Sequence, residues 1–441
     1  MSFLHDHLPY LSDPLLARHF VAGKNDSIEQ WSVERVTAYQ LSAVNELLEY
    51  VEQRSALYRE KMSGMRMGRL TDVRELDRYP FTTREELASA GWGAVTEERK
   101  LLAEVFVSTG TTGGPEVFIA HSYEDLFARD LAPAMPLLVP LLETDLVVNA
   151  LPYEMSSAGL AFHRVFVHGT GAAVFAAGKD GCYSDPSSAW RLIGSLGANA
   201  LITSPSYAIR MSEAAVHATD GGRGPLRLMW LTGEPCSNAL RRRLEHAWRC
   251  PAYFYYGSLE CGGIGIECTE QDGYHLASGH VYVEIVGQHD RVLAPGEIGE
   301  LVVTVLLRRG TPLIRYRTGD LGYIEDYPCA CGITLPRVVL RGRRSDQIRV
   351  GGRVVSPVWI EEMLLRSADV DPWYTIHDRG DDVIIDAVIA DGWRGRQCEL
   401  AERLESRLEY LLGGRVAIRF VSHIDANRGK ARRVQRGGRS R

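Results

Sequence analysis

The sequence predicts an α/β protein with a large N-terminal domain, built from parallel α/β subdomains and a β-rich lobe, and a small α+β C-terminal domain. The chain has 441 residues, too many for one ordinary hydrophobic core. Strand patterns alternate with helical patterns from residue 104 to about 260, as in a parallel sheet. Alternating strands then indicate the β-rich lobe at about 265–340. We expect domains at 1–342 and 343–441.

Helical patterns dominate the first hundred residues. Apolar residues at three- and four-residue spacing in VNELLEYVEQRSALY predict a long amphipathic helix, roughly 33–62. In FTTREEL, Glu86 follows Thr83 by three residues, which predicts a capping box at the start of a second helix. The segment AEVFV, at 103–107, predicts a buried strand.

The middle of the chain supplies the predicted parallel sheet. We expect strands in DLVVNAL, ANALITS, LRLMWLTG and AYFYYG, and helices in DPSSAWRLIGSL and SNALRRRLEHAW. The β-rich lobe contains HVYVEIVGQ, GELVVTVLL and DLGYIED, joined by APGEIG and RRGTP turns. After RGRRSD, a β/α pattern ends in helix QCELAERLESRLEYLL and strand RVAIRFV. The domain boundary is therefore expected near 342–346.

Composition excludes several classes of protein. The apolar content of 45% and the charged content of 24% are typical of a soluble globular protein, and a net charge of −6 gives no argument for nucleic acid. No apolar run reaches membrane-span length, and MSFLHDHLPYLSD lacks the features of a secretory signal. Eight cysteines are too few for a disulfide scaffold in a chain this long. We therefore expect a cytoplasmic protein.

The segment VSTGTTGGPEVF, residues 107–118, is a candidate phosphate loop. Hydroxyl and glycine residues follow a predicted strand, and their backbone amides and hydroxyls can converge on an anion. The segment fits neither the GxxxxGKS/T phosphate loop nor the GxGxxG dinucleotide pattern. The alternative is an ordinary surface turn. The candidate ligands are Ser108, Thr109, Gly110, Thr111, Thr112 and Gly113.

Motifs along nearly the whole chain resemble the phenylacetate–CoA ligase branch of the adenylate-forming ligases. They are YPFTTREEL, STGTTGGPE, ITSPSYA, TGEPCSNALRRRLE, YYGSLECGGIGIEC, TPLIRYRTGDLGYI, CACGITLPRVVLRGRRSDQI and NRGKARRV, in the family's order. The resemblance implies that ATP and a carboxylic acid give an acyl-adenylate and pyrophosphate, after which the acyl group passes to a thiol. It also implies that the C-terminal domain is mobile. Dimerisation is a habit of the family, and only the resemblance suggests a homodimer here.

The resemblance assigns roles to particular residues. Glu260 would bind Mg²⁺, for which carboxylate is a preferred ligand, and Asp320 would hold the ribose hydroxyls. Lys430 would be the catalytic lysine, stabilising charge on the reacting carboxylate and α-phosphate, with Arg343 near the ribose at the hinge. The remaining nucleotide contacts would be Gly233, Glu234, Pro235, Tyr256, Gly257 and Ser258.

Each of these assignments has an ordinary alternative. In isolation, YYGSLE reads equally well as a buried aromatic strand followed by a surface glutamate. Asp320 reads as a turn residue. The segment around Lys430 reads as a solvated basic end that contacts nucleic acid.

Four positions depart from the family pattern. Gly114 replaces the phosphate-loop lysine, and Leu259 replaces the threonine or serine before the magnesium glutamate, although Ser258 lies beside it. Ser345, followed by Asp346, stands where the hinge aspartate is expected, and Gly351 replaces an arginine after the hinge. Loss of one cation from a phosphate site costs about 1–3 kcal/mol. The changed hinge and the loop after it weaken the expectation of thioester formation more than that of adenylation.

Cysteine and histidine residues of the β-rich lobe form a candidate structural zinc site. ECTEQDGYH supplies Cys268 and His275, and CACG supplies Cys329 and Cys331. Cys-x-Cys is tighter than the usual Cys-x-x-Cys spacing, and His280 is an alternative to His275. The competing hypothesis is reduced, buried cysteines without metal.

The substrate is expected to be a small aromatic acid. From the family pattern, Tyr153, Met155, Ala158 and Phe162 would make a flat apolar slot near Tyr256. Glu154 and His163 are polar exceptions that either recognise an amino or hydroxy substituent or lie on the outer face of the helix. The acceptor would be CoA or a carrier-protein thiol. The alternative is a non-thiol acceptor: an amine, or nitrite adenylated to diazotise an aryl amine.

Overall fold

The computed structural model describes residues 27–65, 68–108, 115–142 except 131–140, 144–181, 183–216, 226–325, 327–380, 382–424 and 433–436. The chain divides into two compact units. The first contains residues 1–178, 253–318 and 322–339, and the second contains residues 179–252, 319–321 and 340–441. Both units combine separate stretches of chain, so the expected division at 342 stays a prediction.

The first unit begins with helices rather than strands. Ser32 caps α3 (Val33–Arg54), and Ser55 ends it and caps α4 (Ala56–Lys61). The expected helix at 33–62 is thus two helices, because the Ser55 side chain accepts a hydrogen bond from the Tyr58 amide and starts a new helix. The capping box of α5 (Arg84–Ala90) is present as predicted. Short helices η3 (Ile28–Gln30), η4 (Val73–Arg78), η5 (Gly91–Ala94) and η6 (Arg99–Leu101) connect these elements.

The first strand pair corrects one prediction. β1 (Leu102–Ser108) pairs antiparallel with β2 (Val117–Ser122) as a separate two-stranded sheet. Only Phe106 is fully buried on β1, so the expected buried strand of a parallel sheet is wrong. The parallel pattern begins after α6 (Tyr123–Asp130), where β3 (Leu146–Ala150) pairs with β4 (Ala173–Ala176) across α7 (Ser157–Arg164) and η7 (Val165–Thr170).

The β-rich lobe belongs to a larger run of strands in the first unit. Their spatial order is β10-β11-β12-β13-β9-β8-β7. The strands are β7 (Ala252–Ser258), β8 (Gly262–Glu267), β9 (Tyr274–Leu276), β10 (Val281–Val286), β11 (Gly299–Val305), β12 (Tyr316–Ile324) and β13 (Arg337–Arg343), with η8 (Gln288–Asp290). β7 to β9 form antiparallel pairs, so this part of the chain is a continuous meander.

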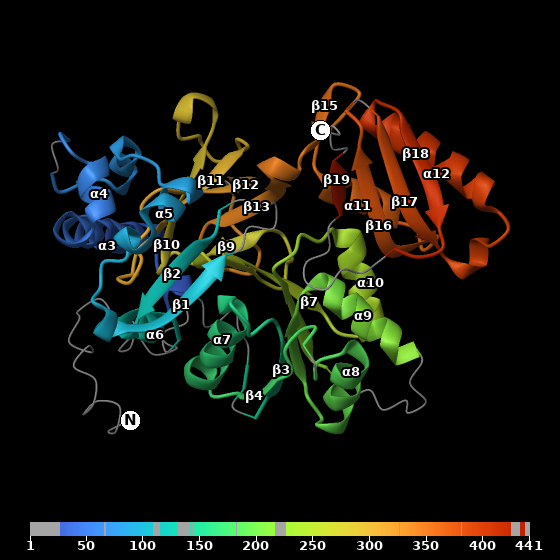
Figure 1. Cartoon of the computed structure of the whole chain (residues 1–441), viewed down its shortest axis with the longest axis horizontal. Helices are drawn as coiled ribbons and strands as arrows, with labels where there is room; N and C mark the ends of the chain where they lie inside the picture. Colours follow the sequence, from blue (N-terminus) through green and yellow to red (C-terminus); the bar gives the residue numbers. More distant parts are fainter. Residues whose placement is uncertain are drawn as a thin grey trace. The chain divides into compact units, whose positions relative to one another are not determined.

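The second unit contains two groups of α/β elements. In the first, β5 (Ala200–Thr203) and β6 (Leu228–Thr232) are parallel and completely buried, with α8 (Pro186–Ser195), α9 (Pro205–Val216) and α10 (Asn238–Trp248). In the second, the strand order is β18-β17-β16-β19, and α12 packs along β18 (Figure 1). Its strands are β16 (Val370–Asp378), β17 (Val383–Ile389), β18 (Val416–Val421) and β19 (Val434–Arg436), and its helices are α11 (Pro357–Leu365) and α12 (Gln397–Leu412), with η9 (Arg344–Asp346) and η10 (Asp391–Trp393). β14 (Ile348–Val350) and β15 (Arg353–Val355) pair antiparallel as a separate two-stranded sheet.

Candidate active site

Arg84, the first residue of α5, contacts both ends of the predicted phosphate loop. Its Nη1 donates to Ser108 Oγ at 2.9 Å, and its Nη2 donates to the carbonyl oxygens of Ser108 and Pro115 at 2.6 and 2.9 Å. The capping box formed by Thr83 and Glu86 fixes the start of α5, and therefore the backbone position from which the Arg84 side chain extends. The loop residues Thr109 to Gly114 lie outside the described residues. A guanidinium therefore stands where the loop begins and ends.

Sequence analysis missed Arg84. The glycine at position 114, in place of the family lysine, was the signal that a cation had to come from elsewhere. An arginine at the start of a capped helix carried no signal of its own, because that position is normally exposed to solvent.

Glu260 is the carboxylate that Arg84 contacts. Its side chain is 9% exposed, so the alternative of a surface glutamate is wrong. Arg84 Nη1 donates to Glu260 Oε1 at 2.5 Å, and Arg308 Nη1 donates to the Glu260 carbonyl oxygen. Burial raises the pKa of the neighbouring Tyr316, and the negative charge of Glu260 raises it further. A carboxylate and a cation are thus held together beside the loop ends.

The turn after β7 orients Glu260. Ser258 Oγ accepts a hydrogen bond from the Cys261 amide at 3.0 Å, which closes the turn across Leu259 and Glu260. Gly257 pairs with Gly263 on β8. Ser258 thus stabilises the turn that contains Leu259, one of the four residues that depart from the family pattern.

The predicted acid pocket is assembled from α7 and β7. The Phe162 ring lies edge-on to Tyr255, with centroids 4.7 Å apart, whereas Tyr256 contacts Tyr274 at 5.8 Å. Successive strand residues point to opposite faces. Tyr255, which sequence analysis did not select, is therefore the β7 aromatic that contacts Phe162. Ala158 is half-buried on the same helix.

Four residues of this region form a hydrogen-bonded pair and an exposed pair. Tyr153 and His163 are hydrogen bonded, with 3.1 Å between the hydroxyl oxygen and Nδ1, and burial raises the pKa of Tyr153 to about 12. Glu154 and Met155 are exposed. His163 is thus joined to a pocket residue, and the assignment of Glu154 to the pocket stays a prediction.

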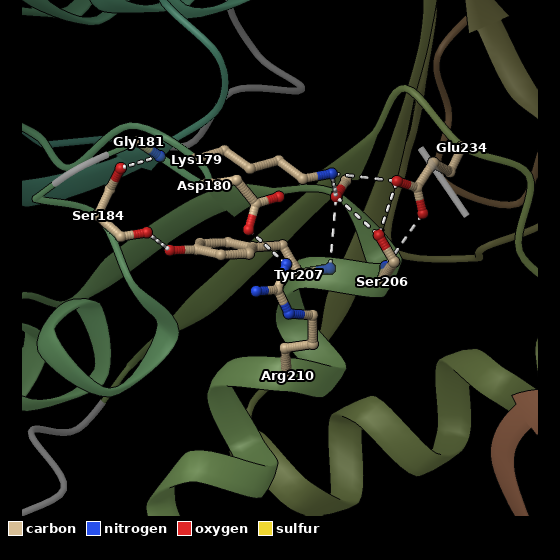
Figure 2. Close-up of polar contacts among 9 residues, drawn as sticks. Lys179, Asp180, Gly181, Ser184, Ser206, Tyr207, Arg210 and Glu234 are labelled. Carbon is tan, nitrogen blue, oxygen red and sulfur yellow. Dashed lines mark hydrogen bonds and ion pairs between the residues drawn. The ribbon is translucent and has the colours of Figure 1, made fainter. Parts of the chain in front are cut away.

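The second unit holds Asp320, Arg343 and the Gly233–Pro235 turn, whereas the predicted nucleotide contacts Tyr256, Gly257 and Ser258 belong to the first unit. Asp320 is buried, and Arg343 Nε lies 3.2 Å from its Oδ1, so the two residues assigned to the ribose are in contact. Glu234, in the Gly233–Pro235 turn after β6, receives hydrogen bonds from Lys179 and Ser206 (Figure 2). Lys179 was not predicted from the sequence.

Lys430, the predicted catalytic lysine, lies outside the described residues, which resume at Arg433. Arg433, three residues later, donates to the Pro372 carbonyl at 2.9 Å and stacks over Tyr374 at 4.4 Å. β19 then pairs parallel with β16. These contacts anchor the segment that follows Lys430.

Gly351, one of the four departures, has a packing explanation. Its φ is +55°, and a Cβ at this position would lie 1.9 Å from the Gly413 carbonyl oxygen. The expected arginine does not fit this backbone approach. The turn between β14 and β15 therefore requires glycine.

The four predicted zinc ligands lie together in the first unit. Their ligand atoms are all within 4.8 Å of one another, with 3.6 Å between the Sγ atoms of Cys268 and Cys329 and 3.3 Å between Cys331 Sγ and His275 Nε2. His275 Nδ1 donates to the Leu335 carbonyl at 3.1 Å, which leaves Nε2 facing the sulfurs. Burial lowers the pKa of His275 and favours the neutral form that binds metal. His275, not His280, belongs to the cluster.

A family and several relatives match this chain. The chain belongs to the family of AMP-binding enzymes, because that family's model matches residues 52–305, more than half of its length. It is 26% identical to phenylacetate-coenzyme A ligase of Escherichia coli over 438 residues, covering 93% of this chain and 97% of that protein. It is 29% identical to the enzyme of the same name from Thermus thermophilus over 361 residues, covering 78% of each.

Solved structures show the same fold. A crystal structure of 2-hydroxyisobutyryl-CoA ligase in the postadenylation state has a TM-score of 0.86 at 19% identity, covering 93% of this chain and 91% of that one. A benzoate CoA ligase from Burkholderia xenovorans has a TM-score of 0.57 at 16% identity, covering 75% and 68%. The predicted fold class is confirmed.

The comparisons also confirm the predicted class of enzyme. The chain is an ATP-dependent, AMP-forming ligase of the phenylacetate–CoA ligase-like branch. Among the described helices, none has the length and apolar character needed to span a membrane.

Proposed function

We propose that this enzyme activates a small aromatic carboxylic acid as its acyl-AMP and transfers the acyl group to CoA or a carrier thiol. The observation that carries the proposal is the position of Arg84, bonded to Ser108 and Pro115 at the loop ends and to Glu260. This arrangement provides charge where a family member handles polyphosphate. The relatives named phenylacetate-coenzyme A ligase support both the acid and the thiol.

Arg84 supplies the charge that the lysine missing at position 114 would otherwise supply. Its guanidinium fork already donates to two carbonyls and a hydroxyl, so it holds the loop ends at a fixed separation. All five of its N–H groups donate within the protein, so a phosphate oxygen would take the place of Glu260 at Nη1. We therefore assign the phosphates to the loop Ser108–Gly113 and to Arg84.

Glu260 fits the role of magnesium ligand. Its carboxylate is a hard oxygen donor of the kind that magnesium prefers. It is also largely buried and already pairs with a cation, Arg84. When bound, Mg²⁺ neutralises phosphate charge. Glu260 would give up its bond to Arg84 and bind Mg²⁺ instead. Arg84 would then donate to the phosphates.

Asp320, Arg343 and Lys430 complete the proposed nucleotide site. Asp320 would accept the ribose hydroxyls, and the 3.2 Å contact from Arg343 orients its carboxylate. Lys430, carried by a small domain over 343–441, would donate to the carboxylate and α-phosphate as the anhydride forms. A Lys430→Ala enzyme that kept full adenylation activity would contradict this role.

The acid slot is proposed around Phe162 and Tyr255, on one face of β7, whereas Tyr256 lies on the other face against Tyr274. The two aromatic rings suit an aryl group, and the Tyr153–His163 pair provides one polar edge. A benzoate or cinnamate type of acid with a hydroxy or amino substituent fits this set.

The Cys268, His275, Cys329 and Cys331 cluster is proposed as a closed structural zinc site. Three thiols and one oriented imidazole match the ligand set of such sites, and no open position is needed. Purified without metal-affinity chromatography, the protein should contain about one equivalent of zinc. Cys329→Ser should lose it, whereas Cys398→Ser, at an exposed cysteine outside the cluster, should retain it. Folded, zinc-free wild-type protein would reject the site.

The function is tested by AMP and pyrophosphate release from ATP with a panel of aryl acids, each with and without CoA. Turnover that requires an acid and CoA supports the proposal and identifies the substrate. A second arm supplies nitrite with an aminoaryl acid. Turnover only in that arm, or only with an amine acceptor, replaces the thiol by a non-thiol acceptor.

A further inference from the structure

A buried ion pair fixes the turn that would lie against the adenine ring. Lys179 Nζ lies 3.2 Å from Glu234 Oε1, and their side chains are 3% and 6% exposed. Lys179 also donates to Ser204 Oγ at 2.7 Å. Figure 2 shows the lysine extended toward Glu234, with Ser206 beside that carboxylate. Neither Lys179 nor the serines belong to the residues assigned above to the nucleotide.

Both carboxylate oxygens of Glu234 are used inside the protein. Oε1 accepts from Lys179 and from Ser206 Oγ, the latter at 2.7 Å, and Oε2 accepts from the Ser206 amide at 3.1 Å. The Ser206 amide is in the first turn of α9, where the helix dipole favours a negative charge. Glu234 is therefore a cap for α9, and its carboxylate already has the partners that a ligand would otherwise supply.

The segment that carries Lys179 is braced against the same helix. Arg210 of α9 pairs with Asp180, and the Tyr207 hydroxyl donates to the Ser184 carbonyl at 2.5 Å. The Gly181 amide donates to Ser184 Oγ at 2.8 Å (Figure 2). The lysine is thus presented from a rigid support rather than from a loose loop.

The turn itself depends on this arrangement. Gly233, with φ of +82°, and Pro235 flank Glu234, and both are exposed while the Glu234 side chain is buried. A turn whose central side chain is locked inward presents its outer backbone in one position. Removal of Lys179 would leave the carboxylate buried without its cation, a cost that movement of the turn toward solvent would relieve.

We propose that Lys179 is a positioning residue for the nucleotide base, acting through Glu234 on the Gly233–Pro235 turn. This inference rests on the proposed function, in which that turn lies against adenine. Lys179 touches neither the nucleotide nor the reacting atoms. Its replacement should weaken binding of the adenine nucleotide while leaving the acid side of the reaction unchanged.

The test compares Lys179→Met with the wild-type enzyme. AMP affinity is measured by calorimetry at a temperature where circular dichroism shows every variant folded, and KM is measured for ATP and for the acid. We expect AMP binding at least tenfold weaker and a higher KM for ATP, with the KM for the acid unchanged. Ser206→Ala, which removes one bond to Glu234 and keeps the cation, should give a smaller loss in the same direction.

Arg315→Met is the matched control. Arg315 forms an equally buried pair with Glu284 in the first unit, with side chains 2% and 3% exposed. This variant should lower the melting temperature but bind AMP as the wild type does. Folded Lys179→Met with wild-type AMP affinity overturns the inference, and if Lys179→Met does not fold, wild-type affinity in Ser206→Ala does so. A wild-type enzyme that fails to bind AMP overturns the proposed function itself.

Discussion

Two glutamate–cation pairs of the same chemistry differ in their contact with solvent. Arg84 and Glu260, beside the phosphate loop, have side chains 21% and 9% exposed. Lys179 and Glu234, beside the nucleoside turn, are 3% and 6% exposed. The first pair can exchange partners with a ligand, because the arginine is reached by water. The second pair is sealed, so it holds the backbone. Burial thus decides whether an ion pair acts on a ligand or on the fold.

The choice of cation agrees with this difference. Arg84 spreads its donors over Ser108, Pro115 and Glu260, which needs the planar fork of a guanidinium. Lys179 places a compact charge between Glu234 and Ser204. Burial of a lysine with few hydrogen-bond partners costs folding free energy unless the carboxylate paired with it keeps its position. The four predictions below therefore separate effects on turnover from effects on stability.

The largest effect is expected from Glu234→Gln. The variant keeps the shape of the side chain but leaves the Lys179 charge buried without its partner, which should cost about 3–5 kcal/mol of unfolding free energy. Chemical denaturation monitored by circular dichroism measures the loss. Glu405→Gln is the control, because Glu405 accepts only a backbone N–H, from Ile418, among the bonds described for it. Equal stability of the two variants would contradict the idea that the buried Lys179–Glu234 pair stabilises the fold.

Glu260→Gln should act on turnover instead. Loss of the proposed magnesium carboxylate is expected to lower the adenylation rate about 10²–10³-fold, comparable to removal of a preorganised electrostatic group. The change in melting temperature should be smaller than that of Glu234→Gln, because water reaches Arg84. Pyrophosphate release measures the rate. In Glu104→Gln, which disturbs a similarly exposed pair with Arg164 in the same unit, the rate should stay close to wild type.

Arg84→Lys tests whether charge alone is sufficient at the loop. A lysine keeps the charge but cannot bond Ser108 and Pro115 together, so the KM for ATP should rise about five- to tenfold, or about 1–1.4 kcal/mol. Steady-state kinetics at varied ATP give the value. A wild-type KM for ATP in this variant would show that the two-ended contact is unnecessary.

Sequence patterns predicted the local structure and the order of the motifs better than they predicted contacts. The Thr83–Glu86 capping box and most strands follow from spacing alone, because these signals lie within a few residues. Ser55 was hidden inside a continuous apolar repeat, so the break between α3 and α4 was missed. β1 carried apolar residues but lies in a separate hairpin, which no local pattern reveals.

The site residues show the same limit. Glu260 and the cysteine–histidine cluster were selected from motifs, and the structure brings His275 to Cys331 although 56 positions separate them. Arg84 and Lys179 were missed because their partners, at Glu260 and Glu234, are 176 and 55 positions away. Each is an ordinary charged residue until the fold supplies the carboxylate. Such long-range pairs are decided by tertiary packing rather than by local propensity.

The smallest effect is expected where a pair is most exposed. Arg419, 55% exposed, donates to Asp386, which also bonds His377 at 2.7 Å. Burial alone would raise the pKa of Asp386, but the bonds from Arg419 and His377 hold it below its ordinary value. A lowered folded pKa stabilises the protein above the unfolded pKa, about 3.9, and this contribution is lost as pH falls through the folded value. Arg419→Gln should therefore lower the melting temperature only slightly at pH 7, because solvent screens the exposed guanidinium.

That decrease should disappear as Asp386 is protonated. Melting temperatures of wild type and Arg419→Gln, measured at low salt from pH 7 downward, are expected to converge below about pH 4. Arg349→Gln, at an exposed position on β14, controls for loss of one positive charge. A loss of stability at neutral pH as large as the one expected for Glu234→Gln would mean that solvent exposure does not rank these pairs. Because the three pairs share the same charges, only exposure and the number of partners can produce the expected order.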